Sequence, residues 1–264
     1  MPEIDYLEIF LEPIRKCAYY TPKFGSSARK QGLVLIDFKN LYGSDPFYSW
    51  IGLDSDLMYA AHKAAGGMTS VYRQIGIGCE RLFREVLFDV AGYADRASLT
   101  WSYSTKTRSG ESKKLSLDGR LGLEDIARRD VRERTRKWMV DYCRQLDIPD
   151  VPRRGAVFEI RQGYKSKDSK RQNADIDNAT VAWSHGYLPV FAVFSSQIDS
   201  DIVLRYRNNR CGILTGVRDS GPFTSLYDFM DEVVGYDLAG FFEANGRVIR
   251  TEIEGILETL LRPE

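Results

Sequence analysis

Residues 187–195 read Tyr-Leu-Pro-Val-Phe-Ala-Val-Phe-Ser, a continuous apolar run of the kind found in strands buried on both faces. A second strand is predicted at residues 156–162, with a helix at 172–185 between the two. A helix at 199–208 and a strand at 212–215 continue the alternation. This order implies right-handed crossovers and an α/β fold in which helices flank a central mixed sheet.

The spacing of apolar side chains predicts the remaining elements. Recurrence at three- and four-residue steps predicts helices at 3–16, 68–91 and 123–146, and over most of the last 40 residues. Alternation at 98–121 predicts a hairpin that turns at Ser109-Gly110. No domain boundary is visible, so we expect a single domain. Its parts are an N-terminal extension (1–67), a core (68–216) and a helical C-terminal part (217–264).

Charge is unevenly distributed along the chain. The 264 residues include 37 Lys and Arg against 37 Asp and Glu, a formal net charge of zero. Residues 105–172 alone hold 19 basic and 11 acidic side chains, a surplus of eight that the remainder balances. A basic middle between acidic flanks suggests a face for a polyanion. Solvated helix faces are the alternative interpretation, because Asp130 and Glu133 can pair with arginines at helical spacing.

The cysteines and the apolar runs indicate the cellular compartment of the protein. Four cysteines lie far apart in the sequence without CxxC spacing, so they predict free thiols in a reducing compartment rather than a zinc site. The first residues alternate acids with apolar side chains, unlike a signal peptide, and no run is long enough to span a membrane. We therefore expect a cytoplasmic protein.

Two carboxylates lie on or shortly before the strand predicted at 156–162. Glu159 lies on this strand, and Asp150 precedes it by nine residues in a Pro-Asp pair. A two-residue turn at Arg154-Gly155 would form a hairpin in which Asp150 faces Glu159, with Cβ atoms roughly 5 Å apart. Carboxylates that close repel each other unless a cation lies between them. Mg²⁺, which prefers oxygen ligands, fits this need.

Cations follow the acids. Arg161 shares the strand face of Glu159 through the two-residue period of a strand, so it can hold a phosphate or orient an attacking water. Lys165 is a second candidate cation. Polar side chains beyond it suit contacts to the phosphate oxygens and base edges of DNA: Lys167, Lys170, Arg171, Gln172 and Asn173.

The stretches Glu159–Asp175 (EIRQGYKSKDSKRQNAD) and Gly66–Glu85 (GGMTSVYRQIGIGCERLFRE) resemble type II restriction endonucleases. Together with residues 187–216, the resemblance covers about half of the chain. The PD-(D/E)xK core of that family is a helix, a three-stranded meander, a helix and a further strand, and its acids bind one or two Mg²⁺. The resemblance implies that Glu159 is the second acid and that Arg161 or Lys165 takes the place of the lysine.

The first acid has two main candidates. Asp150 offers the literal Pro-Asp and the cross-strand geometry, and is slightly preferred. Asp118, in LSLDGR, follows the predicted hairpin in the order typical of the family, with an inserted helix before Glu159. Glu80, on the helix predicted at 68–91, ranks third.

The resemblance implies Mg²⁺-dependent, sequence-specific hydrolysis of double-stranded DNA by a homodimer, with a companion DNA methyltransferase in the host. The alternatives are a repair or structure-selective nuclease with the same core, and a DNA-binding protein without chemistry. A pure binder would gain nothing from acids that face phosphate. Gly32–Phe38 also reads as a strand, and it carries Asp37 two residues before Lys39. No acid precedes it on a plausible partner strand, so Asp37 is interpreted as structural, or as a DNA or dimer contact.

Overall fold

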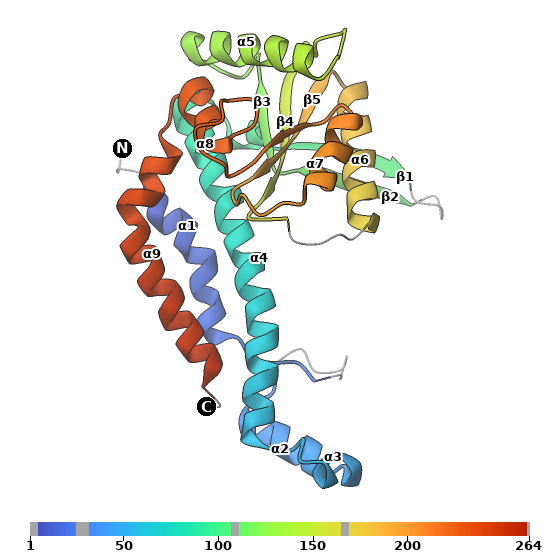
Figure 1. The fold of residues 1–264 in the computed structure, drawn as a ribbon, viewed down its shortest axis with the longest axis vertical. Helices are drawn as coiled ribbons and strands as arrows, with labels where there is room; N and C mark the ends of the chain where they lie inside the picture. The colour runs from blue at the N-terminus through green and yellow to red at the C-terminus, as the bar shows by residue number, and fades with distance from the viewer. Residues whose placement is uncertain (1–4, 25–31, 107–110, 165–168, 263–264) are drawn as a thin grey trace. The chain divides into compact units, whose positions relative to one another are not determined.

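The computed structural model describes residues 5–24, 32–106, 111–164 and 169–262. These residues form two compact units. One unit combines residues 1–78 with 244–264, and the other comprises residues 79–243. Helices α4 (Asp56–Ala91) and α9 (Leu238–Leu261) each contribute to both units (Figure 1). The units do not coincide with the three parts predicted from the sequence.

A four-stranded sheet organises the unit of residues 79–243, and its strand order is β3-β4-β5-β6. Strand β3 is antiparallel to β4, while β4, β5 and β6 are parallel to one another, so the sheet is mixed. The prediction of an α/β fold with a mixed sheet flanked by helices is confirmed. The strands are β3 (Gly119–Gly122), β4 (Gly155–Arg161), β5 (Tyr187–Val193) and β6 (Gly212–Leu214).

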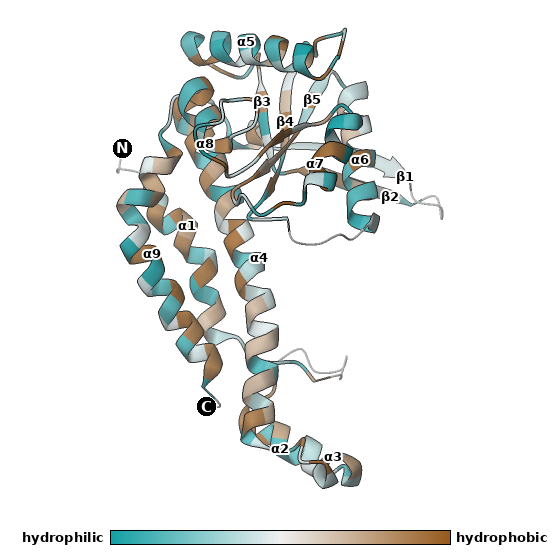
Figure 2. Ribbon diagram, in the orientation of Figure 1, coloured by the Kyte–Doolittle hydropathy of each residue, from teal (hydrophilic) through white to brown (hydrophobic). Residues whose placement is uncertain are grey.

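Helices connect these strands and cover both faces of the sheet. Helix α5 (Arg129–Gln145) lies between β3 and β4 in the chain, α6 (Ser169–Ser184) between β4 and β5, and α7 (Ser200–Asn208) between β5 and β6. Side chains of α6 and α7 share a buried core with β5 and β6. On the other face, Trp138 of α5 packs against Phe229, whose ring also contacts Phe158 of β4. Figure 2 shows the hydrophobic colouring of the central strands.

The predicted hairpin is confirmed as a separate two-stranded sheet of β1 (Trp101–Lys106) and β2 (Ser112–Leu117), which follows the short helix η2 (Arg96–Leu99). Trp101 and Leu117 are paired across it and pack against Val157 of β4. The predicted turn at Ser109-Gly110 lies outside the described residues.

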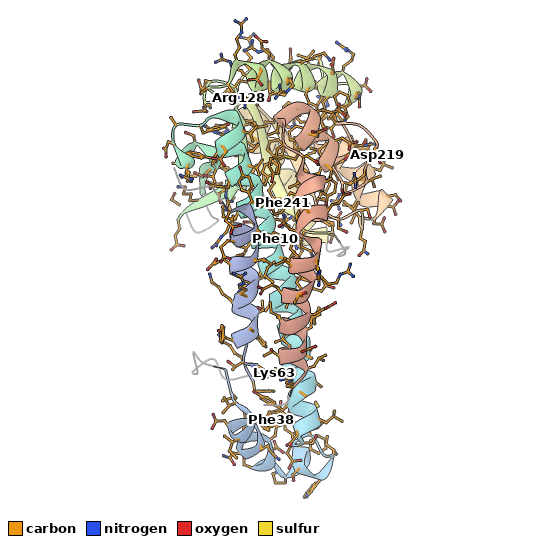
Figure 3. The ribbon with its side chains drawn as sticks, turned by 90° about the vertical axis from the view of Figure 1, so that its left-hand side faces the viewer. Phe10, Phe38, Lys63, Arg128, Asp219 and Phe241 are labelled. Carbon is orange, nitrogen blue, oxygen red and sulfur yellow. The ribbon has the colours of Figure 1, made fainter. Side chains whose placement is uncertain are left out.

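The strand predicted at Gly32–Phe38 is wrong, because α2 (Leu35–Gly43) begins inside it. Phe38, labelled in Figure 3, is fully buried, with its ring centroid 4.4 Å from that of Tyr42, one helical turn later. Ile36 is 63% exposed. One buried side chain per turn suits a helix, whereas the strand prediction rested on an apolar run without periodicity.

The unit of residues 1–78 and 244–264 is otherwise helical. The helix predicted at 3–16 is confirmed as α1 (Tyr6–Arg15), and the helix predicted at 68–91 is confirmed as part of α4, which begins earlier, at Asp56. A Cβ at Gly78, inside α4, would lie 2.5 Å from the Phe10 carbonyl oxygen of α1, so glycine permits this contact. The remaining elements here are η1 (Lys16–Tyr19) and α3 (Pro46–Trp50).

The predicted helical C-terminal region is confirmed over α8 (Leu226–Asp228), the π-helical segment η3 (Phe229–Val234) and α9. Ser225 caps α8, since its side chain accepts a hydrogen bond from the Asp228 amide. None of the helices in the described ranges combines the length and the apolar character that crossing a membrane requires.

Candidate active site

Asp118 and Glu159 meet where β3 and β4 pair. Gly119 lies opposite Phe158 in this antiparallel ladder, so the residue before Gly119 falls beside the residue after Phe158. The Asp118 carboxylate accepts a hydrogen bond of 2.9 Å from the Ile160 amide, which fixes it against β4. The acid that the family order indicated is therefore the one that the sheet brings to Glu159.

The predicted hairpin between Asp150 and Glu159 is wrong. Strand β4 pairs with β3 and β5, so no strand formed by residues 150–153 lies against it. Asp150 is exposed in the turn after α5. Gly155 is not the second residue of a tight turn: its φ is +136°, and a Cβ there would lie 1.9 Å from the Leu121 carbonyl oxygen of β3. The neighbour of β4 at this edge is β3, which begins 36 residues earlier in the chain, and not the segment directly before β4.

Arg161 shares the face of Glu159, as the two-residue period predicted. Its Nη2 lies 2.8 Å from Glu159 Oε1 and 2.9 Å from Asp175 Oδ1. The exposed fractions of the three side chains are 15%, 15% and 6%. The Nε atom of Arg161 is buried and has no hydrogen-bond partner among the described residues. The guanidinium therefore bridges two acids and keeps one donor for another group.

Asp175 is a site residue that sequence reasoning missed. It lies on α6 and forms hydrogen bonds with Tyr206 and Tyr164 as well as its ion pair with Arg161. A signal for it was present, because Asp175 lies four and seven residues before the buried Ala179 and Ala182. An acid on the buried face of a helix needs a partner.

The Asp118 carboxylate is close enough to Glu80 of α4 to affect the pKa of Glu80. Burial first, and then the Asp118 carboxylate, raise the pKa of Glu80 to about 7. Arg84, one turn later, donates a hydrogen bond of 3.0 Å to the Asp118 carbonyl oxygen, and its guanidinium lies 3.9 Å from the Glu80 carboxylate. Glu80, Asp118 and Glu159 thus form an interacting set, which includes the third-ranked acid of the sequence analysis.

The acids resist full ionisation. Burial first, and then the Asp118 carboxylate, raise the pKa of Glu159 to about 8, and together they outweigh the attraction of Arg161 at 2.8 Å. Burial also raises the pKa of Asp118, although the Ile160 amide opposes this shift. An additional cation would relieve the repulsion between these carboxylates.

The donor set suits Mg²⁺ in chemistry and in number. Within the part of the chain that the structure describes, no three His, Cys, Asp or Glu side chains are gathered as metal ligands. Mg²⁺ does not need three, because it retains several waters and binds through one or two carboxylates. Asp118, directly before β3, and Glu159, on the adjacent β4, supply two carboxylates.

The other predicted site residues are distributed as follows. Lys165 and Lys167 lie outside the described residues. Lys170 and Arg171 are exposed on α6. Gln172 is buried, and its side-chain oxygen accepts a hydrogen bond of 2.7 Å from Arg205. Asn173 accepts another from the same guanidinium. Both amides thus hold a side chain of α7, and their role in DNA contact stays a prediction.

Ion pairs on α5 neutralise part of the basic segment. Arg128, labelled in Figure 3 just before the helix, pairs with Asp130. Arg129 pairs with Glu133 at helical spacing. The solvated-face interpretation therefore accounts for part of the surplus. Three further arginines, Arg132, Arg136 and Arg153, line a polar hollow of about 400 Å³ together with Leu123, Glu124, Arg129 and Glu133.

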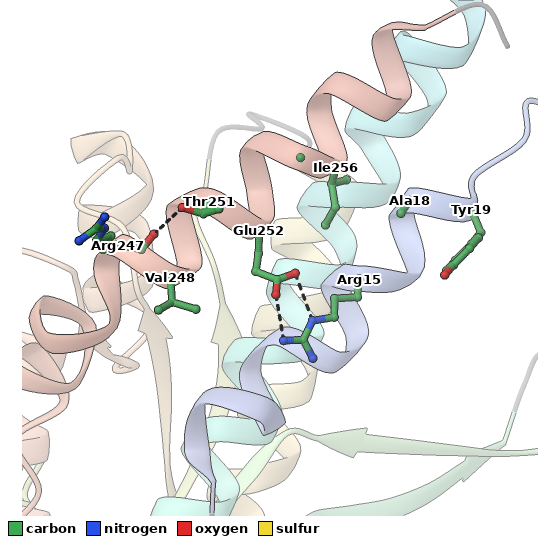
Figure 4. Close-up of a pocket in the computed structure, with 9 residues that line it drawn as sticks. Arg15, Ala18, Tyr19, Arg247, Val248, Thr251, Glu252 and Ile256 are labelled. Atoms are coloured by element: carbon green, nitrogen blue, oxygen red, sulfur yellow. Dashed lines mark hydrogen bonds and ion pairs between the residues drawn. The ribbon is translucent and has the colours of Figure 1, made fainter.

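A larger pocket of about 550 Å³ lies in the other unit, between η1 and α9 (Figure 4). Arg15 and Glu252 form an ion pair there. Much of the remaining lining is apolar, and the pocket lacks the paired acids of the β3–β4 site. Asp37 is exposed in the first turn of α2 in this same unit, on a helix rather than on the predicted strand.

Comparison of the chain with protein-family models, with curated proteins and with solved structures finds no match.

Proposed function

We propose that this protein is a metal-dependent nuclease that hydrolyses double-stranded DNA in the manner of type II restriction endonucleases. The observation that carries the proposal is the placement of Asp118 beside Glu159, with Arg161 two residues further along β4. One acid directly before β3, with a second acid and a cation on the adjacent β4, suits the arrangement that the resemblance implied. The crossover through α6 to a parallel strand also suits that core.

Asp118 and Glu159 would hold Mg²⁺, which supplies an activated water and charge neutralisation at the phosphate when it is bound. Arg161, which pairs with Glu159, would offset the negative charge that develops on the scissile phosphate. Glu80, with its pKa raised to about 7, can exchange a proton near neutral pH.

The partners belong to the same proposal. A palindromic target suits a two-fold homodimer, because the symmetry of the enzyme then matches that of the DNA. A DNA methyltransferase in the host would protect host sites. A repair nuclease with the same acids is the second candidate, since the site chemistry does not distinguish the two.

Unmethylated plasmid DNA tests the proposal. The protein is incubated with plasmids in Mg²⁺, in Ca²⁺ or in EDTA, and the fragment ends are sequenced. Discrete fragments in Mg²⁺ alone are expected, since Ca²⁺ is larger and activates water poorly. A smear would favour the repair nuclease. Equal cleavage in EDTA, or intact DNA in Mg²⁺, would overturn the metal-dependent nuclease.

A further inference from the structure

Asp175 is buried in the unit of residues 79–243, where both of its carboxylate oxygens have partners. The residue is 5% exposed. Its Oδ1 pairs with Arg161 Nη2 at 2.9 Å, and its Oδ2 accepts a hydrogen bond of 2.8 Å from the Tyr206 hydroxyl. The Tyr164 hydroxyl lies 2.8 Å from that of Tyr206 and 3.4 Å from Asp175 Oδ2. Both carboxylate oxygens are therefore committed to named partners.

The surroundings make this arrangement rigid. Tyr206, on α7, is fully buried, and its ring stacks on Phe191 of β5 with centroids 4.2 Å apart. Burying a carboxylate is costly unless charge and hydrogen bonds compensate its loss of water. Arg161 provides the charge and Tyr206 the hydrogen bond. The orientation of Asp175 is thus fixed by α7, and Asp175 in turn fixes the guanidinium.

We propose that Asp175 is the positioning residue of the active site, which holds Arg161 beside Glu159 in the orientation that the phosphate requires. Tyr206 and Tyr164 act through Asp175, and neither needs to touch DNA. The inference rests on the proposed function, because Arg161 has a catalytic part only if the Glu159 site acts on a phosphodiester. A displacement of about 1 Å at a reacting group can cost roughly 100-fold in rate.

Single-turnover cleavage in Mg²⁺ tests the proposal with Asp175→Asn and Tyr206→Phe. We expect the cleavage rate constant to fall about 10- to 100-fold, while the Kd for DNA measured in Ca²⁺ changes by less than about threefold. Asp177→Asn removes the same charge from an exposed position of the same helix and should match the wild type. Circular dichroism and thermal unfolding establish that each variant is folded.

Epistasis separates positioning from a purely structural role. In an Arg161→Ala background, Asp175→Asn should slow cleavage no further, because the side chain that it positions is gone. If Asp175→Asn lowers the cleavage rate constant by the same factor in the Arg161→Ala background as in the wild type, the proposal is overturned. A wild-type rate constant in Asp175→Asn alone would overturn it as well. If Asp175→Asn does not fold, Tyr206→Phe decides the matter, and an unchanged rate refutes positioning. Failure of the wild type itself to cut DNA in Mg²⁺ would instead overturn the nuclease, and this inference with it.

Discussion

Asp118 and Asp150 are chemically identical side chains in different surroundings. Asp118 is half-buried beside Glu159 and is fixed by the Ile160 amide, whereas Asp150 is exposed after α5. We expect Asp118→Asn to reduce Mg²⁺-dependent cleavage by on the order of 100-fold or more, because it removes one of the two carboxylates that we propose as metal ligands. Asp150→Asn is the matched control and should cut like the wild type. Loss of activity in Asp150→Asn alone would place the first acid there.

The raised pKa of Glu159 has a consequence for stability in the absence of metal. The folded-state pKa is about 8, and the unfolded value is about 4.5, so the folded protein binds more protons between these pH values. Stability should therefore fall as pH rises from about 4.5 to about 8. We expect a loss of a few kcal/mol from this group, since each unit of difference between the folded and unfolded pKa is worth about 1.4 kcal/mol.

Glu159→Gln removes the pH-dependent contribution of Glu159 to folding stability. Chemical denaturation in EDTA at pH 5.5 and pH 8.5 should show a smaller decline for the variant, which should be the more stable protein at pH 8.5. A variant that loses as much stability as the wild type would show that Glu159 is ionised throughout this range.

Helix α4 contains two glycines whose surroundings differ. Nothing lies within 4 Å of a Cβ added at Gly76, whereas one added at Gly78 meets the Phe10 carbonyl oxygen at 2.5 Å. Gly76→Ala should stabilise the protein by about 0.5–1 kcal/mol through helix propensity. Gly78→Ala should destabilise it by about 1–3 kcal/mol, because α1 must shift. Urea denaturation measures both, and equal effects would mean that α1 does not approach α4 this closely.

Local elements could be predicted from the sequence where periodicity or an unbroken apolar run was present. The run at 187–195 and the helix that became α5 are examples. The pairing of Asp118 with Glu159 could not be predicted with certainty, because α5 separates β3 from β4 and nothing local selects a partner strand across it. The ion pair of Arg161 with Asp175 depends on how α6 packs against the sheet. The hairpin interpretation failed for the related reason that a Gly can mark a close strand contact as well as a turn.

At the scale of the whole molecule, zero net charge hides local surpluses. We expect DNA affinity in Ca²⁺ to fall at least about tenfold between 50 and 200 mM salt. Each phosphate that the protein neutralises releases counterions, and a few such contacts are enough for a fall of this size. Arg136→Gln should reduce the salt slope if the α5 hollow contacts DNA, since Arg136 has no ion pair with any described residue. Arg129→Gln, which removes a cation already paired with Glu133, is the comparison. A DNA affinity that does not depend on salt would argue against contacts between the protein and the phosphate backbone of DNA.

The chain passes between its two units at residues 78–79 and 243–244, and both positions lie inside helices, α4 and α9. Proteases act on exposed, locally unfolded chain, and at neither passage does the structure offer such a segment. Limited digestion should therefore trim the protein elsewhere before it separates the units. A gene fragment that encodes residues 79–243 alone would begin and end in severed helices, so the unit that contains Asp118 and Glu159 cannot simply be excised or grafted onto another protein.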